Sequence, residues 1–256
     1  MEPKLKENKV VATIEARMSS TRLPGKVLMD LGGYKSLELQ IKRLRKSKLI
    51  DEVVIATTVN EVDDAIVNFG KSMKCKVFRG SEDDVMKRIL DAVRSVGGEI
   101  QVQITGDCPL IDARVIDKLI RFLLCNLEYD FVSNEIERTY PIGLDCRVFK
   151  VSALEKANSL CDDPIHRLHG STFIYTGEHK SLFLSKNINA PKSIFYPNWR
   201  WTLDTIEDLE FLRSILDYYG KGIVSLSSSS LAKWLIQNPK IIQINSNVRQ
   251  KNFEEG

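Results

Sequence analysis

Three cationic side chains, Arg17, Arg22 and Lys26, fall within ten residues in the stretch EARMSSTRLPGK. Small hydroxyl residues lie between them, and Pro24-Gly25 allows the backbone to turn tightly against a ligand. Arginine can bind phosphate oxygens in bidentate fashion, and lysine adds a compact charge. A helix that began after the loop would also aim free N–H groups at a bound anion. The loop is therefore predicted to bind phosphate, and the alternative is a solvated basic loop without a ligand.

Two aspartates stand at the ends of segments with strand character. Asp107 lies in QITGDCPLID, and Asp204 lies in WRWTLDTIEDLEFL. The competing interpretations are a turn cap for Asp107 and a helix N-cap for Asp204, with acids in the first helical turn. Mg²⁺ prefers hard oxygen ligands and often takes one or two carboxylates together with substrate phosphates. A basic loop combined with two such carboxylates predicts a site for Mg²⁺ and a triphosphate, with Asp107 and Asp204 as the metal ligands.

Other kinds of site are disfavoured by the sequence. Neither GxxxxGK[ST] nor GxGxxG occurs, so a P-loop or a dinucleotide-binding fold is not indicated. His166 and His169 are three residues apart, but no cysteine lies at zinc spacing from them. Without a GxSxG motif or a cysteine–histidine pairing, a covalent nucleophile is unsupported.

Composition limits the class of protein. With 256 residues, 43% hydrophobic and 28% charged, the chain has the make-up of a soluble globular protein. A net charge of +3 is too mild to predict binding to nucleic acid or membrane. The N-terminal stretch MEPKLKENKV lacks an apolar signal segment, and no run approaches the length of a membrane span. Five cysteines without a CxxC pair predict reduced thiols, so we expect a cytoplasmic protein.

The elements that must position these residues alternate in the first half of the chain. Alternation of this kind predicts an α/β fold with a mostly parallel sheet covered on both faces. Ligands bind such sheets at the carboxyl ends of the strands, where the basic loop is expected to lie. We expect strands over residues 10–16, 51–58, 76–79 and 100–105. Helices are expected over 36–48 and 60–73, and two more should begin at a capping box at 81–84 and after Asp112.

The second half of the chain is less regular. Strand-like pieces at 131–134, 144–148 and 182–185 flank a helix predicted at 151–160. We interpret residues 134–198 as an arm inserted into a single domain that spans residues 1–256. Regular structure is predicted to return with a strand at 201–204 and a helix at 205–219, and a C-terminal helix and tail occupy about 220–256.

Seven stretches in order resemble a known family, the SpsF-type cytidylyltransferases of surface polysaccharide synthesis. These are relatives of the CMP-Kdo and CMP-sialic acid synthetases. The matching stretches are EARMSSTRLPGKVLMDLGG, DEVVIATT, VFRGSEDDVMKR, QITGDCPLID, VSN, PIGLDCRVF and WTLDTIEDLEFL, and they span most of residues 9–219. The combination is highly specific for the fold and for nucleotidyl transfer, and much less specific for the acceptor.

The resemblance implies a Rossmann-like α/β nucleotidyltransferase fold, with CTP held by the basic loop. It implies catalytic roles for Arg17, Lys26, Asp107 and Asp204, with Mg²⁺ on the two aspartates. The implied nucleotide-binding residues are Ala16, Arg17, Ser19, Arg22, Lys26, Thr57, Arg79, Ser81, Asp84 and Gly106. The implied acceptor-binding residues are Asp145, Arg147, His169 and Arg200. The inserted arm resembles the one through which related synthetases dimerise, so a homodimer is expected.

The sequence departs from the family pattern at two positions on the acceptor side. Arg147 stands where the family commonly has glutamate after GLDV, and Leu168 stands where it has the glutamate of REHVT. An arginine donates hydrogen bonds and favours planar anions, so these changes suggest an acceptor with a carboxylate or phosphate. The alternative is that Arg147 points outward and pairs with a surface acid.

The predicted function is Mg²⁺-dependent transfer of CMP from CTP to a small-molecule acceptor, with release of pyrophosphate. The acceptor is expected to be a sugar, a sugar acid or a phosphorylated compound used for surface polysaccharide or glycoconjugate synthesis. Two alternatives remain open at this point: a nucleotidyltransferase that uses another nucleoside triphosphate, and a catalytically silent partner subunit of a glycosyltransferase. No nucleic acid or membrane partner is expected.

Overall fold

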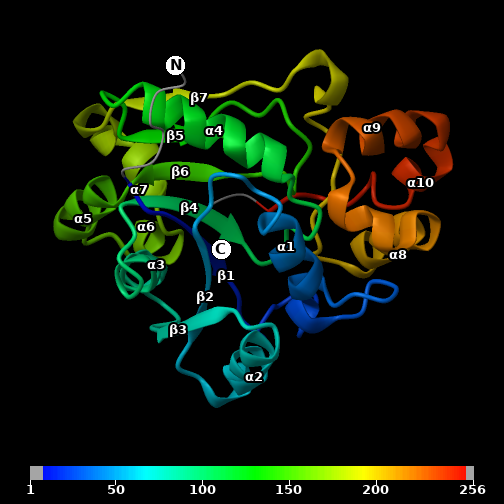
Figure 1. Cartoon of the computed structure of the whole chain (residues 1–256), viewed down its shortest axis with the longest axis horizontal. Coiled ribbons are helices and arrows are strands. Elements are labelled where there is room, and N and C mark those ends of the chain that lie inside the picture. The colour runs from blue at the N-terminus through cyan, green and yellow to red at the C-terminus, as the bar shows by residue number, and fades with distance from the viewer. Residues whose placement is uncertain (1–7, 252–256) are drawn as a thin grey trace.

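A seven-stranded sheet forms the centre of the part of the chain that the computed structural model describes, residues 8–251 (Figure 1). Its strand order is β3-β2-β1-β4-β6-β5-β7. The strands are β1 (Val10–Glu15), β2 (Glu52–Thr58), β3 (Lys76–Gly80), β4 (Ile100–Thr105), β5 (Phe131–Ser133), β6 (Arg147–Lys150) and β7 (Ser185–Asn187). Strands β1 to β4 are mutually parallel, and β6 runs antiparallel to its neighbours β4 and β5. The predicted α/β fold with a mostly parallel sheet is confirmed.

Helices cover both faces of the sheet, which explains why the central strands are almost continuously apolar. One hydrophobic core joins β1 to α1 (Ser36–Leu44), α2 (Asp64–Ser72) and α4 (Ala113–Cys125). On the opposite face, a second core joins the sheet to α3 (Val85–Arg94), α5 (Val151–Leu160) and α7 (Thr172–Tyr175), with α6 (Pro164–Leu168) beside them. In β1, Ile14 belongs to the first core and Val11 to the second, as alternation along a strand requires.

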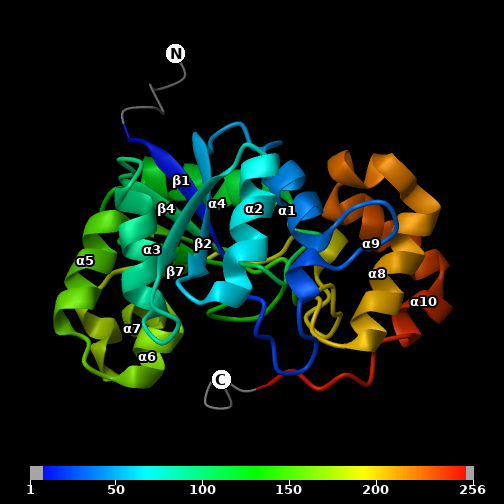
Figure 2. The ribbon, with the colours of Figure 1, turned by 90° about the horizontal axis from the view of Figure 1, so that it is seen from below.

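A helical layer at the side of α1 completes the fold. It comprises α8 (Ile206–Tyr219), α9 (Ser228–Gln237) and α10 (Pro239–Gln243), which Figure 2 shows packed together beyond α1. From α10 the chain turns back and runs along the molecule toward its centre (Figure 2). Short 3-10 turns occur at η1 (Lys26–Leu28), η2 (Glu61–Asp63), η3 (Glu178–Leu182), η4 (Lys192–Ile194) and η5 (Gly220–Ser225).

Several helix starts follow the local sequence signals. Asp112 accepts a hydrogen bond from the N–H of Arg114 at 2.9 Å, and Thr205 forms a capping box with Asp208 at the start of α8. The capping box predicted at Ser81 is wrong, because the residue that caps α3 is Asp84. The helix predicted over 60–73 begins as the 3-10 turn η2. Asn60 stands at the N-cap position of this turn, but its side-chain amide donates to Glu82 at 2.5 Å and makes no capping bond.

Two expectations for the second half of the chain differ from the structure. Strands β6 and β7 lie within the expected arm at 134–198, yet they pair with β4 and β5 and so belong to the main sheet. The segment at 201–204 is not a strand. Its neighbour Arg200 forms only an isolated β-bridge with Ile142. Tertiary hydrogen bonds, rather than pairing with a neighbouring strand, therefore position this segment.

Within residues 8–251 no helix is long and apolar enough to cross a membrane.

Candidate active site

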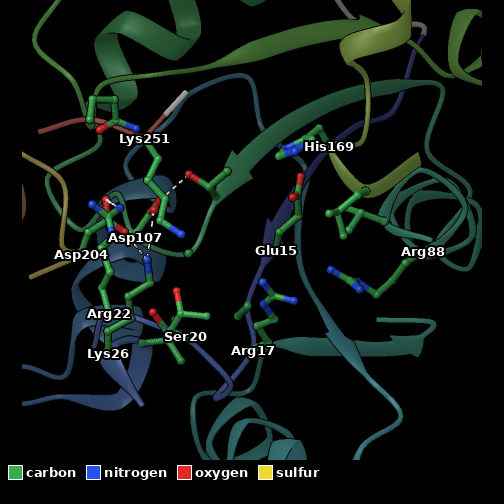
Figure 3. Close-up of a pocket in the computed structure, with 18 residues that line it drawn as sticks. Glu15, Arg17, Ser20, Arg22, Lys26, Arg88, Asp107, His169, Asp204 and Lys251 are labelled. Carbon is green, nitrogen blue, oxygen red and sulfur yellow. Dashed lines mark hydrogen bonds and ion pairs between the residues drawn. The ribbon is translucent and has the colours of Figure 1, made fainter. Parts of the chain in front are cut away.

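Two adjoining cavities open at the carboxyl ends of β1 and β4. The first has a volume of about 380 Å³ and is lined by the basic loop and by Glu15, Gly106 and Asp107 (Figure 3). The second has a volume of about 340 Å³ and lies toward β6, with Asp145 and Arg147 in its wall. Their position agrees with the rule that ligands bind α/β sheets beyond the carboxyl ends of the strands.

The ammonium of Lys26 lies between the two predicted metal ligands. Its Nζ is 3.2 Å from Asp107 Oδ2 and 2.6 Å from Asp204 Oδ1 (Figure 3). Burial alone would lower the pKa of Lys26, but the two carboxylates outweigh burial and raise it above its ordinary value. Burial likewise acts to raise the pKa of Asp107, yet Lys26 and the Thr105 hydroxyl hold that pKa well below its usual range. Both carboxylates therefore converge on one cation position.

Asp204 is anchored by a buried arginine. Arg200 donates from Nη2 to Asp204 at 2.6 Å and from Nε to Asp208 at 2.9 Å, and only 4% of Arg200 is exposed. Arg22 Nη2 approaches Asp204 Oδ2 at 3.1 Å from the solvent side. The carboxylate is thus fixed by charge-assisted hydrogen bonds from several directions, which sets the direction of the oxygen that faces Lys26.

The basic loop is folded back against the sheet edge. Gly25 adopts a positive φ of 71° and donates its N–H to the Met18 carbonyl at 2.9 Å, which closes the turn predicted at Pro24-Gly25. Asp63 accepts from the Met18 N–H at 2.7 Å and ties the loop to η2. Only a single 3-10 turn, η1, follows the loop directly, so side chains rather than a helix terminus would provide most of any anion binding.

Glu82 accepts hydrogen bonds from Arg17 and Ser19, which we predicted to bind phosphate, and also from Asn60. Its carboxylate accepts from Arg17 Nη1 at 3.1 Å, from Ser19 Oγ at 2.8 Å and from Asn60 Nδ2 at 2.5 Å. The hydrogen bond from Ser19, together with those from Asn60 and Arg17, lowers the pKa of Glu82. These three donors can hold an anionic group.

Three charged residues that line the first cavity, Glu15, Arg88 and Lys251, were not predicted from the sequence. Glu15 ends β1 and accepts from Gln103 Nε2 at 2.5 Å, and burial raises its pKa despite the nearby Arg147 and Arg88. Arg88 projects from α3 into the same cavity, where burial lowers its pKa. Glu15 gave the same signal as Asp107, an acid directly after an apolar strand, whereas Arg88 gave none beyond its helical position.

The second cavity contains two pairs of opposite charge. Arg138 donates to Asp145 at 2.8 Å, and Arg147 pairs with Glu135 and lies 5.6 Å from the centre of the Tyr175 ring. Asp145 and Arg147 line the same cavity, although Asp145 precedes β6, which begins at Arg147. Arg147 therefore faces inward rather than to the surface, but its guanidinium already has an acid partner.

The structure brings only part of the predicted nucleotide site into the first cavity. Ala16, Arg17, Arg22, Lys26 and Gly106 line it, and His169 lies at the border of both cavities. Gly106 is required there by space, because a Cβ atom would lie 2.6 Å from the Glu15 carbonyl oxygen.

The remaining predicted residues, Ser19, Thr57, Arg79, Ser81, Asp84 and Arg200, line neither cavity. Arg79 donates to the backbone oxygens of Thr58 and Asn60, and Thr57 is fully buried. Ser81 and Asp84 form the turn and cap before α3. Arg200, predicted to bind the acceptor, is buried and donates to Asp204 and Asp208 instead.

The donor set fits a magnesium ion. Mg²⁺ is commonly held by one or two carboxylates plus phosphate oxygens, and Asp107 and Asp204 present hard oxygens to the position that the Lys26 ammonium now takes. No cluster of three or more histidine, cysteine or acidic side chains suited to a metal occurs among residues 8–251, so water and phosphate oxygens would have to supply the other ligands of such an ion.

A parallel sheet with a basic loop and two convergent aspartates at its carboxyl edge defines a nucleotidyltransferase. A sequence profile of the family described as cytidylyltransferase matches residues 11–223, and the chain belongs to that family.

Known proteins support this assignment over nearly the whole length. The chain is 37% identical over 247 residues to an uncharacterised protein of Methanocaldococcus jannaschii, covering 96% of this chain and 98% of that one. It is 30% identical over 240 residues to the spore coat polysaccharide biosynthesis protein SpsF of Bacillus subtilis, and the match covers 91% of this chain and 96% of that one. A solved cytidylyltransferase from Leptospira borgpetersenii superposes with a TM-score of 0.87 at 35% identity, covering 96% and 100%.

Proposed function

We propose that this cytidylyltransferase uses CTP and Mg²⁺ to transfer CMP to an oxygen atom of a sugar, sugar acid or phosphorylated acceptor, with release of pyrophosphate. The observation that carries the proposal is the pair of adjoining cavities that share Asp107 and Asp204 in their walls. A nucleotide in the first cavity and an acceptor in the second would meet at these carboxylates. The name of the SpsF relative, a polysaccharide biosynthesis protein, supports a sugar-type acceptor.

The chain's own residues would perform three tasks in this reaction. Arg17, Arg22 and Lys26 would bind the phosphates that leave as pyrophosphate and stabilise the charge that builds on them. Asp107 and Asp204 would hold Mg²⁺, which neutralises charge on the phosphate oxygens when it is bound. The acceptor oxygen would attack the α-phosphorus in line, so no covalent enzyme intermediate is required.

The second cavity supports an acceptor that offers both hydroxyl groups and an anionic group. Glu135 and Asp145 can accept hydrogen bonds from hydroxyls, while Arg138 and Arg147 can donate to a carboxylate or phosphate. An anionic acceptor would have to share Arg147 with Glu135, its present partner. A polyol acid such as 3-deoxy-manno-octulosonate has both kinds of group.

The proposal is tested by a pyrophosphate-release assay with the purified protein and MgCl₂. CTP, UTP, ATP and GTP are each combined with a panel of neutral sugars, sugar acids and sugar phosphates, including 3-deoxy-manno-octulosonate. We expect release with CTP in the presence of at least one acceptor, and loss of release when EDTA is added. Faster release with another triphosphate would assign a different base, and absence of release with every combination would favour a silent partner subunit.

A further inference from the structure

The reacting phosphorus must lie where the two cavities meet, because it is bonded to the nucleotide before the reaction and to the acceptor afterwards. Residues that line both cavities are therefore those that can contact the α-phosphate. They are Thr105, Asp107, His169, Asp204, Gln250 and Lys251. Two of them belong to the segment that follows α10, far in sequence from the sheet.

Lys251 supplies an ammonium group to this shared set. Lys26 and Arg22 line the first cavity only, and Arg138 and Arg147 line the second only. Within residues 8–251, the Lys251 ammonium makes no hydrogen bond or ion pair, whereas Lys26 and Arg22 each contact an acid. Figure 3 shows Lys251 entering from above Asp107, on the side of the cavity that holds Asp204 and opposite Glu15 and Arg88.

The segment that carries Lys251 is fastened to the same arginine that anchors Asp204. Asn245 is only 3% exposed and donates from Nδ2 to the Arg200 carbonyl and to Asp208 Oδ1, both at 2.9 Å. Five residues later, Gln250 accepts a hydrogen bond from Arg200 Nη1. Because Arg200 Nη2 also holds Asp204, the position of Lys251 is coupled to that of a proposed metal ligand.

We propose that Lys251 binds the α-phosphate of the nucleotide and stabilises the charge on it during transfer. The proposal rests on the proposed function and adds to it a residue outside the sheet and the basic loop. Phosphate is bound well by an ammonium that carries no competing acid, and a cation at the transferred phosphoryl group favours in-line displacement.

The test is calorimetric and needs no acceptor. Cytidine, CMP and CTP are titrated at saturating MgCl₂ into the wild-type chain and into Lys251→Ala, Lys251→Arg and Lys240→Ala. Loss of a charge-assisted hydrogen bond should raise the Kd of CMP and CTP about ten- to hundredfold in Lys251→Ala and leave the Kd of cytidine unchanged. Lys251→Arg should retain most of the affinity, and Lys240→Ala, at an exposed residue of α10, should match the wild type.

Two further variants separate α-phosphate binding by the Lys251 ammonium from a general loss of positive charge or of side-chain packing. Arg22→Ala should weaken the binding of CTP and leave the binding of CMP unchanged, because the Arg22 side chain lines the first cavity alone. Lys251→Cys, made in a Cys125→Ser background to remove the exposed native thiol, should recover CMP affinity after aminoethylation with 2-bromoethylamine.

The outcomes distinguish the two proposals. If wild-type protein binds CMP and Lys251→Ala binds it equally well, the role of Lys251 is overturned while the proposed function stands. Equal loss of cytidine and CMP affinity, with a lower melting temperature, would assign Lys251 a structural role instead. Failure of the wild type to bind any of the three nucleotides would overturn the proposed function and this inference with it.

Discussion

Leu203 donates its backbone N–H to the carbonyl oxygen of Asp107 at 2.8 Å. The Thr202 hydroxyl donates to the same oxygen at 2.9 Å. These two hydrogen bonds fasten the segment that ends in Asp204 to the end of β4, although the two segments are far apart in sequence. They place the carboxylates of Asp107 and Asp204 next to the same cation, the Lys26 ammonium, although no strand pairing joins the two segments.

The two aspartates should be separable by their effects on stability. We expect Asp107→Asn and Asp204→Asn each to lower kcat by at least about a hundredfold, because preorganised charge at the transferred group is lost. Asp204→Asn should also lower the melting temperature by more than Asp107→Asn, since it leaves the buried Arg200 with one acid fewer. Pyrophosphate release and thermal unfolding measure the two effects, with Asp162→Asn at an exposed position as the control. Near-normal rates in either variant at saturating Mg²⁺ would contradict the metal site.

The basic loop should bind phosphate and not the nucleoside. Lys26→Ala and Arg17→Ala are expected to raise the Kd of CTP by about tenfold or more and to leave the Kd of free cytidine nearly unchanged, because each would remove a charge-assisted contact to phosphate alone. Isothermal calorimetry with both ligands provides the measurement. A similar loss for cytidine and CTP would show that the loop contributes to folding or base contact rather than to triphosphate binding.

Glu82 should compete with the nucleotide for the basic loop. In Glu82→Gln the side chain keeps its shape but loses the charge that draws Arg17 and Ser19 outward. We expect CTP to bind about three- to tenfold more tightly, the range that loss of one exposed charge pair allows. Asp83→Asn changes the next residue of the same turn and serves as the matched control. Weaker CTP binding in Glu82→Gln would mean that Glu82 positions Arg17 for phosphate instead of occupying it.

The acceptor pocket should discriminate by charge at Arg147. For an anionic acceptor, Arg147→Ala is expected to raise the acceptor KM about ten- to hundredfold, because a charge-assisted hydrogen bond is lost. The KM for CTP should stay near its wild-type value. Since Arg147→Ala would leave Glu135 buried without its partner, the double variant with Glu135→Gln is needed to keep the pocket folded. A neutral sugar as the best acceptor, or an unaltered acceptor KM, would end this hypothesis.

Glu15 should destabilise the fold as pH rises. Burial raises the pKa of Glu15 in the folded state. The stability that its protonated form contributes is therefore fully present below the pKa of the unfolded state, about 4.3. It is lost as pH rises through the pKa of the folded state. Glu15→Gln cannot titrate and keeps the contact with Gln103. Urea unfolding should therefore show that the free energy of unfolding of Glu15→Gln increases relative to that of the wild type as pH rises. The increase should span the range from the unfolded-state pKa to the folded-state pKa of Glu15. Glu210→Gln, on the exposed side of α8, provides the comparison, and a pH-independent difference would contradict the assignment.

Local sequence pattern was sufficient to predict several of the elements, in both halves of the chain. The strand predicted at 100–105 is observed as β4, and the helix predicted at 151–160 is observed as α5. Each has an apolar repeat that is complete within the segment, so no distant contact is needed to recognise it. The loop and the two aspartates were found for a related reason, since they follow segments with strand character and the ends of strands form the ligand edge, whereas Gly106 was named only through the family resemblance.

Features that depend on distant contacts were not predictable in this way. The segment at 201–204 has strand character in sequence, but its partners Asp107 and Ile142 lie in other parts of the chain. Arg79 looked like a ligand residue, yet the turn after β2 captures its guanidinium through the Thr58 and Asn60 carbonyls. Lys251 gave no signal at all, because its place at the site is set by how the chain returns from α10.

The pairing of charges around both cavities has a consequence for how fast a substrate is captured. Arg17, Arg22, Lys26, Arg138 and Arg147 each contact an acid of the same chain. Such pairs cancel much of the potential that would otherwise extend into solvent, so electrostatic steering of a polyanion toward the site is weak. The association rate constant for the nucleotide should then change little with ionic strength, and rearrangement of these ion pairs after encounter, rather than diffusion, should govern how quickly the bound complex forms.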